Sequence, residues 1–238
     1  MFHVKHCLTF SMKGCEKMQN FSQWLENFTN AVKLAFPQEL YFLGLQGSYA
    51  RGEASSDSDI DVVVLFKELN SNILKNYRDI LSNMPEQEKI CGFVGGYQEL
   101  AAWQRGDLFQ LYHDTIALYG DLDFIKPLAD KNAAAELVQL SACNLYHGCC
   151  HNYLHARSTT VLRELYKAAV FAVQAKYYLE QGVYLHKHRI LAENVIKADK
   201  RILQYGEAVH AARNDEIAGF DEYSMYLLHW CQHLIKQK

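Results

Sequence analysis

The stretch GLQGSYARGEASSDSDIDVVVLF, residues 44–66, joins two apolar runs through a Gly-Ser pair, an arginine and a cluster of acids. The second run, from residue 59, is rich in β-branched residues and apolar on both faces, which is typical of a strand covered on both sides. The first run, residues 40–46, is short and also favours a strand. A turn between two strands needs few charges. The charges here therefore either solvate a loop or hold a metal ion and a phosphate.

Two of the acids, Asp59 and Asp61, are two positions apart at the start of the second strand. Because strand side chains alternate between faces, we expect both carboxylates on one face, with Ile60 and Val62 on the other face, in the core. Neighbouring carboxylates repel each other unless a positive group joins them. Mg²⁺ prefers oxygen ligands and commonly shares them with substrate phosphates. The spacing therefore predicts a magnesium site.

The Gly-Ser pair, Gly47 and Ser48, ends the first strand. A glycine lets backbone amides approach a phosphate closely, and the serine hydroxyl adds a donor. A short helix from Tyr49 would direct its free N–H groups at the same anion, and Arg51 would add a charged donor. An isolated Asp-x-Asp is more often an acidic surface turn. The Gly-Ser pair and the flanking strands favour a site for a metal ion and a phosphate instead.

The composition of the chain is that of an ordinary globular protein. Its 238 residues, half of them hydrophobic, and its net charge of −3 suit one large or two smaller domains with a sizeable core. This charge argues against bulk nucleic-acid binding. The first residues lack the pattern of a secretory signal, and no run is apolar enough to span a membrane. Seven cysteines without a regular spacing predict free thiols in a reducing cytoplasm.

The pattern of hydrophobic residues changes near residue 127. Before it, helical and strand segments alternate, and after it only long helix-compatible segments occur. The expected fold class is α+β, with a small mixed sheet followed by an all-α helical bundle. We expect an N-terminal extension over residues 1–19, the sheet domain over residues 20–127 and the helical domain over residues 128–238. The expected strands lie within residues 40–46, 59–66, 89–96 and 107–120.

The segment GSYARGEASSDSDIDVVV resembles the signature of the nucleotidyltransferase superfamily typified by DNA polymerase β, which is Gly-Ser, then Ser-Asp-x-Asp, then a hydrophobic strand. It is most similar to the minimal nucleotidyltransferases and the aminoglycoside nucleotidyltransferases. The residues that match the pattern are Gly47, Ser48, Arg51, Ser58, Asp59 and Asp61. The resemblance is specific over residues 40–66 and looser to residue 120. In the helical half it is one of kind only, to kanamycin-type enzymes and HEPN proteins.

The resemblance implies a transfer reaction. An acceptor hydroxyl attacks the α-phosphorus of a nucleoside triphosphate, in the first place ATP, and pyrophosphate leaves. Two Mg²⁺ ions would be held by Asp59 and Asp61, and would act on the attacking and leaving oxygens. The implied nucleotide-binding residues are Gly47, Ser48, Arg51 and Ser58.

The resemblance favours a small-molecule acceptor of the aminoglycoside kind in a cytoplasmic enzyme. Two alternatives stay open. One is a toxin–antitoxin nucleotidyltransferase that modifies a protein or tRNA, and the other is a catalytically weak nucleotide-binding module. The resemblance implies no membrane partner and leaves a homodimer open.

The family also uses a third carboxylate on a later strand. The expected strand has no acid between Ile90 and Gly96. Glu99, just past it, is the nearest candidate for a catalytic acid, and Asp107 and Asp114 are others. If none of these acids reaches the metal ions, the weak nucleotide-binding module becomes the better interpretation.

Cys143, His147, His151 and His155 recur at four-residue spacing within one expected helix. These residue types suit a transition-metal site, but a zinc site rarely takes four ligands from one helix. A polar face against the sheet domain is the second interpretation, and a lining of the acceptor pocket by His151 or His155 is the third. Similarly, residues 183–190 (VYLHKHRI) either begin a solvated helix or contact a phosphate or RNA.

Overall fold

The computed structural model describes residues 4–212 and 217–237, with side chains from residue 20 onward. The chain divides into two compact units. The first unit comprises Met1–Ala50, Ala54–Leu100 and Ile116–Asp121, and the second comprises Arg51–Glu53, Ala101–Thr115 and Leu122–Lys238. Residues 101–115, which the sequence places in the sheet domain, are therefore grouped with the helices that follow.

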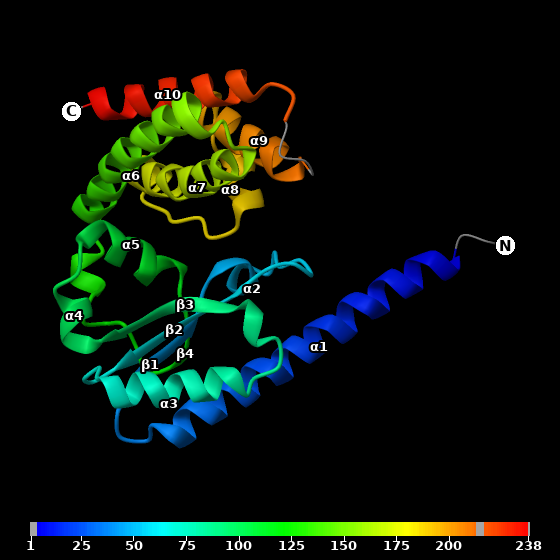
Figure 1. Ribbon diagram of the computed structural model, residues 1–238, viewed down its shortest axis with the longest axis vertical. Coiled ribbons are helices and arrows are strands. Elements are labelled where there is room, and N and C mark those ends of the chain that lie inside the picture. Colours follow the sequence, from blue (N-terminus) through cyan, green and yellow to red (C-terminus); the bar gives the residue numbers. More distant parts are fainter. Residues whose placement is uncertain (1–3, 213–216, 238) are drawn as a thin grey trace. The chain divides into compact units, whose positions relative to one another are not determined.

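The first unit is built around a four-stranded sheet with the order β3-β2-β1-β4 (Figure 1). Strand β2 is parallel to β3, and β1 is antiparallel to both β2 and β4. The strands are β1 (Leu40–Leu45), β2 (Ile60–Phe66), β3 (Ile90–Gly96) and β4 (Ile116–Tyr119). The expected mixed sheet is confirmed, and each strand falls within the segment predicted for it.

Helices α1 (Val4–Ala35) and α3 (Ser71–Ser82) cover one face of this sheet (Figure 1). Part of the predicted N-terminal extension is thus helical, because α1 begins at Val4. The buried residues of this layer are Trp24, Phe28, Val32 and Phe36 of α1, Ile73 and Tyr77 of α3, and Ile60, Val62, Val64 and Phe66 of β2. Since every second residue of β2 points into this core, Asp61 points to the opposite face.

Short helices complete the chain around the sheet. They are α2 (Gly47–Arg51), the 3₁₀ turn η1 (Gln87–Lys89) and α4 (Tyr97–Ala101). Helix α2 follows β1 directly and leads into the loop before β2, so it occupies the position at which the sequence predicts a short helix.

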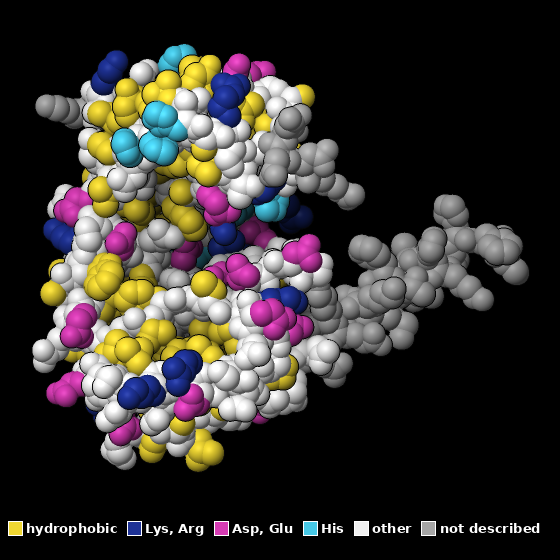
Figure 2. Space-filling view, viewed as in Figure 1, with side chains coloured by type: hydrophobic (Ala, Val, Ile, Leu, Met, Phe, Trp, Pro, Cys, Tyr) yellow, Lys and Arg dark blue, Asp and Glu magenta, His cyan; other side chains and the backbone are white. Residues whose placement is uncertain are grey.

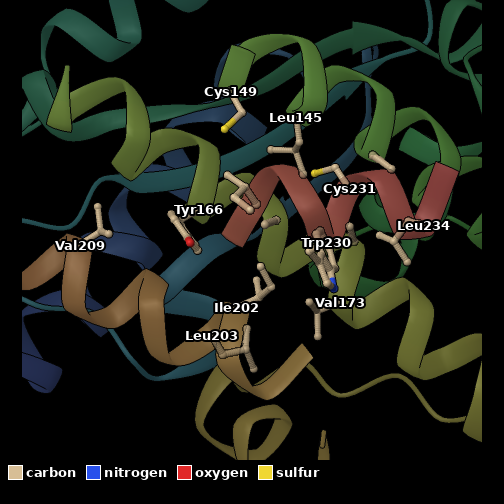
Figure 3. Packing of buried hydrophobic residues seen from close by; sticks show 14 of the residues in the cluster. Leu145, Cys149, Tyr166, Val173, Ile202, Leu203, Val209, Trp230, Cys231 and Leu234 are labelled. Carbon is tan, nitrogen blue, oxygen red and sulfur yellow. The ribbon is translucent and has the colours of Figure 1, made fainter. Parts of the chain in front are cut away.

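The second unit is helical, as expected for this half of the chain. Its long helices are α6 (Lys131–His151), α7 (Thr159–Gln181), α9 (Lys197–Ala211) and α10 (Phe220–Lys236). Its shorter elements are α5 (Arg105–Asp114), η2 (Lys126–Leu128), the π turn η3 (Asn152–Ala156) and α8 (His188–Asn194). The long helices share one core, shown in Figure 3. Tyr166, at its centre, donates from its hydroxyl to the carbonyl oxygen of Tyr223 at 2.8 Å.

Helix α5 belongs to the second unit because it packs closely on α6. Phe109 of α5 is fully buried in a cluster with Ala133, Ala134 and Leu137 of α6. A Cβ atom on Gly106 would lie 2.9 Å from the Cα atom of Leu137. The absence of a side chain at Gly106 therefore allows the backbones of α5 and α6 to approach each other.

No helix within residues 4–212 and 217–237 has both the length and the apolar character that a membrane span requires. Among the described side chains, the free cysteines are Cys91, Cys143, Cys149, Cys150 and Cys231, in agreement with the predicted free thiols. Cys7 and Cys15 lie outside the residues whose side chains are described.

Candidate functional site

The turn between β1 and β2 brings Gly47 against Asp61. The backbone N–H of Gln46 donates to the carbonyl oxygen of Asp61 at 2.7 Å, which fixes the end of β1 beside the start of β2. Gly47 follows with a φ of +67°, in the left-handed region that favours glycine. A Cβ atom at this position would lie 1.9 Å from Oδ2 of Asp61. Only glycine fits here, and the backbone of this corner directly contacts the Asp61 carboxylate.

Asp61 is half-buried in β2, on the face opposite to Ile60 and Val62. Asp59 is exposed and precedes the strand by one residue, whereas the sequence predicts it inside the strand. Only Ile60 separates the two acids along the chain, which places their Cα atoms about 7 Å apart where the backbone is extended. Two carboxylates at this spacing supply the oxygen ligands that Mg²⁺ prefers.

The two predicted serines have different surroundings. Ser48 is half-buried in the first turn of α2, where the leading N–H groups of a helix lack partners within the helix and suit an anion. The Ser58 hydroxyl accepts from the N–H of Ser55 at 2.9 Å and lies 3.2 Å from the Ser55 hydroxyl. Ser58 therefore stabilises the loop that leads to Asp59 by hydrogen bonds to Ser55.

Arg51 ends α2 and is paired with a residue of its own loop. Its Nε atom is 3.1 Å from Oε2 of Glu53, and its side chain is only 13% exposed. The other carboxylate oxygen of Glu53 accepts from the N–H of Arg189 at 3.4 Å. The pKa values of Asp114 and His188 also respond to the Arg51 charge, so these groups are its neighbours within the second unit. A phosphate at Arg51, as the sequence predicts, would compete with Glu53 for the guanidinium.

Arg51, Glu53, Asp114 and His188 form one polar group within the second unit. Asp114, at the end of α5, is its buried acid and is 7% exposed. Its burial raises the pKa of its carboxyl, against the lowering effects of the Tyr184 hydroxyl, Arg51 and His186. The Nδ1 atom of His186 lies 3.8 Å from Oδ1 of Asp114. Residues 183–190 are therefore held by Glu53 and Asp114, and the sequence interpretation as a purely solvated helix start does not describe them.

His188 makes the stability of this polar group depend on pH. Burial, and then the Arg51 charge, lower the pKa of His188 to about 4, whereas an unfolded histidine titrates near 6.5. Between these values the unfolded state binds more protons, so the free energy of unfolding falls as the pH decreases from about 6.5 to about 4. Between about pH 6.5 and pH 4, we expect the free energy of unfolding of the His188→Asn variant to fall by roughly 1–3 kcal/mol less than that of the parent. Urea unfolding across this pH range measures the difference. Equal losses in both proteins would assign the effect to another group.

The structure does not bring Glu99 to the two acids. In the parallel β2–β3 pair, Asp61 is opposite Cys91, whereas Gly96, against which the Glu99 carboxylate lies, is opposite Phe66. Five strand positions separate these two ends, which is about 16 Å. Glu99 follows the end of β3, whereas Asp61 is at the start of β2. The expectation that Glu99 shares a metal ion with Asp61 is therefore corrected.

Cys91 is the residue of β3 directly opposite Asp61, and its thiol is exposed. Directly paired residues of neighbouring strands point to the same face, so this thiol is the β3 side chain nearest to the acids.

Asp107 accepts a hydrogen bond from Trp103 at 3.2 Å within the second unit. Among the side chains that the structure describes, no group of three or more His, Cys, Asp or Glu residues is placed to hold a metal ion. Sequence patterns could not have selected Cys91, because its position opposite Asp61 depends on the strand register.

Comparison with known proteins points to the same segment. Residues 25–94 match the family described as a nucleotidyltransferase domain. A comparison with curated proteins finds no match. The fold is similar to the crystal structure of spectinomycin adenyltransferase AAD(9) from Enterococcus faecialis with ATP and spectinomycin, with a TM-score of 0.54 and 15% identity. The similarity covers 91% of this chain and 99% of that one. Residues 25–94 are therefore similar to a nucleotidyltransferase domain, and the chain as a whole shares its fold with an adenyltransferase.

Proposed function

We propose that this protein transfers the nucleoside monophosphate of ATP to a hydroxyl group of a small-molecule acceptor and releases pyrophosphate. The contact between Gly47 and the carboxylate of Asp61 carries this proposal. It sets a corner of backbone N–H groups, which suits a phosphate, directly beside oxygen atoms that suit a metal ion. Both residues lie within the segment that matches the nucleotidyltransferase family.

The residues of the corner have separate roles in this reaction. Asp59 and Asp61 would hold Mg²⁺, because carboxylate oxygens are the ligands this ion prefers. Bound there, Mg²⁺ would stabilise charge on the attacking and leaving oxygens. Gly47 and Ser48 would bind the phosphates and orient the α-phosphorus. The acceptor oxygen then bonds to the α-phosphorus while the bond to the pyrophosphate oxygen breaks, and the acceptor hydroxyl gives its proton to solvent water.

The choice of acceptor class rests on the similarity to the spectinomycin adenyltransferase. The structure of that protein contains ATP and spectinomycin, and the shared fold extends over nearly all of both chains. The helical unit thus has a counterpart in a protein whose acceptor is a small molecule. A small molecule with a free hydroxyl is the acceptor that this similarity supports.

Nucleotide binding with little transfer is the second candidate, and Cys91 is the observation that favours it. A thiol, not a carboxylate, lies opposite Asp61 on β3. Mg²⁺ prefers oxygen ligands, so a sulfur ligand at this position adds little to its binding. Weak metal binding would leave the phosphates bound but the transfer slow.

The two candidates are distinguished by incubating the full chain and Mg²⁺ with each α-labelled nucleoside triphosphate and a panel of acceptors. The panel contains spectinomycin, aminoglycosides, tRNA and a protein mixture, and released pyrophosphate is measured. Transfer from ATP to a small molecule supports the proposal. Binding of ATP without pyrophosphate release for any acceptor supports the second candidate, and label on tRNA or protein would overturn the acceptor class.

The Cys91→Asp variant tests whether the thiol limits metal binding. A third carboxylate beside Asp59 and Asp61 adds an oxygen ligand, so we expect severalfold less Mg²⁺ to be needed for half-maximal ATP binding. Titration of ATP binding with Mg²⁺, followed by calorimetry, measures this change. Cys91→Asn is the matched control, since it has the same size without the charge. Equal Mg²⁺ requirements for the two variants would show that position 91 lies outside the metal site.

A further inference from the structure

We infer that His151 and His155 form a two-residue surface site that binds a divalent transition metal such as Zn²⁺, Ni²⁺ or Cu²⁺. Both histidines are exposed, His151 at the end of α6 and His155 on the π turn η3. Figure 2 shows histidine side chains gathered on the surface of the helical unit. This site is separate from the proposed transfer reaction, because imidazole selects transition metals and carboxylate selects Mg²⁺.

The spacing of the rings suits shared coordination. The ring centroids of His151 and His155 are 4.8 Å apart, and those of His147 and His151 are 6.4 Å apart. Two nitrogens that each bind Zn²⁺ at about 2.0–2.1 Å can be at most about 4 Å apart. Rings whose centroids are 4.8 Å apart reach this separation with a small rotation of exposed side chains. His151 and His155 therefore form the ligand pair, whereas the rings of His147 and His151 are too far apart in this arrangement.

His155 lies on the π turn η3, whereas His147 and His151 lie on α6. In this turn the N–H of Arg157 donates to the carbonyl of Asn152 at 2.7 Å. Single π turns of this kind occur frequently at functional sites.

The backbone that carries His155 is held by contacts on its other side. Asn152 is buried, and its side chain both donates to the carbonyl of Ser158 and accepts from the N–H of Ser158, each at 3.0 Å. Arg157 has a φ of +45° and pairs with Asp221 at 2.7 Å. The turn is therefore fixed without any use of the imidazole rings, which stay available to a ligand. A ligand pair on a fixed backbone has less entropy to lose when it binds a metal ion.

The charge of this helix also suits a cation. Residues 132–156 contain no Lys or Arg, and Glu136 is their only acid. The next charge along the chain is that of Arg157, which is paired with Asp221 at 2.7 Å, and histidine binds a metal in its deprotonated form. The surface pair occupies only part of a metal coordination shell, which water would complete. This agrees with the absence of a larger ligand group among the described side chains.

The test is calorimetric titration of the full chain, without an affinity tag, with ZnCl₂ in chelator-free buffer. We expect the His151→Ala, His155→Ala double variant to lose one equivalent of bound Zn²⁺ that the parent binds. The His210→Ala, His233→Ala double variant, which removes exposed histidines of α9 and α10, is expected to keep it. Asp61→Asn should also keep it, so failure of the proposed transfer reaction would leave this inference intact.

A spectroscopic measurement identifies the ligands directly. The electron paramagnetic resonance spectrum of the parent with one equivalent of Cu²⁺ should show nitrogen hyperfine splitting, and the His151→Gln, His155→Gln variant should lose it. These glutamines keep the polarity of the surface, so the comparison does not depend on the effect of alanine on folding. Zn²⁺ binding that the alanine double variant keeps at full affinity, or a Cu²⁺ spectrum without nitrogen ligands, would overturn the inference.

Discussion

The Asp61→Asn variant is expected to transfer nucleotide at least about 10²–10³-fold more slowly than the parent, with the fold retained. Asparagine keeps the size of the side chain beside Gly47 but removes the negative charge that would hold Mg²⁺. Because Asp61 is half-buried and its position is fixed by the bond between Gln46 and its own carbonyl, no neighbouring acid can easily take its place. Pyrophosphate release under saturating ATP and acceptor measures the effect.

The control for this variant is Asp79→Asn, on the exposed surface of α3. It removes the same charge from the same unit but away from the turn at Gly47 and Ser48, and we expect it to keep the parent rate. Circular dichroism and thermal unfolding of both variants establish that the fold is retained. A folded Asp61→Asn protein with the parent rate would refute the role proposed for Asp61 beside Gly47.

The Gly47→Ala variant is expected to lose both stability and activity. A side chain in the left-handed region costs roughly 1–2 kcal/mol, and forcing a methyl group into occupied space costs roughly 1–3 kcal/mol more. Here the methyl group would meet the Asp61 carboxylate at 1.9 Å, so the carboxylate must move or the corner must open. Either movement separates the Gly47 backbone from the Asp61 carboxylate, and with them the groups proposed to bind the phosphates and the metal ion. Urea unfolding and pyrophosphate release measure the two losses.

A matched control separates the two costs. Gly52 has a similar φ of +69°, but a Cβ atom there would have no heavy atom within 4 Å, so Gly52→Ala tests the backbone cost alone. Adding Asp61→Ala to Gly47→Ala should restore roughly 1–3 kcal/mol of stability, because the double variant removes the crowded carboxylate. If Gly47→Ala is no less stable than Gly52→Ala, the contact between Gly47 and Asp61 is not the tight one described above.

The parts of the site that sequence could predict are local. The β-branched run after residue 59 indicates β2, and the Gly-Ser pair marks the end of β1. Alternation along an extended strand then determines the face of Asp61. These relations involve neighbouring residues, which is why the structure reproduces the four predicted strands and the corner.

The parts that sequence could not predict depend on contacts between distant segments. The parallel register of β2 and β3 decides whether Glu99 or Cys91 lies beside Asp61. The sequence of the helix between these strands does not determine that register. The surroundings of Arg51 likewise depend on Asp114 and on residues 183–190. A sequence pattern identifies charged residues, but tertiary packing decides which charges become neighbours.

The grouping of α5 with α6 has a consequence for recombination between homologous genes. The chain leaves the sheet unit after Leu100, packs Phe109 against α6, and then returns to form β4 at the edge of the sheet. A chimera joined at residue 121 would inherit α5 from one parent and α6 from the other. Such a protein would have to rebuild the close approach at Gly106 and the pocket of Phe109. Viable exchanges of the helical unit are therefore expected to carry residues 101–115 along with it, as an insert within the sheet-forming sequence.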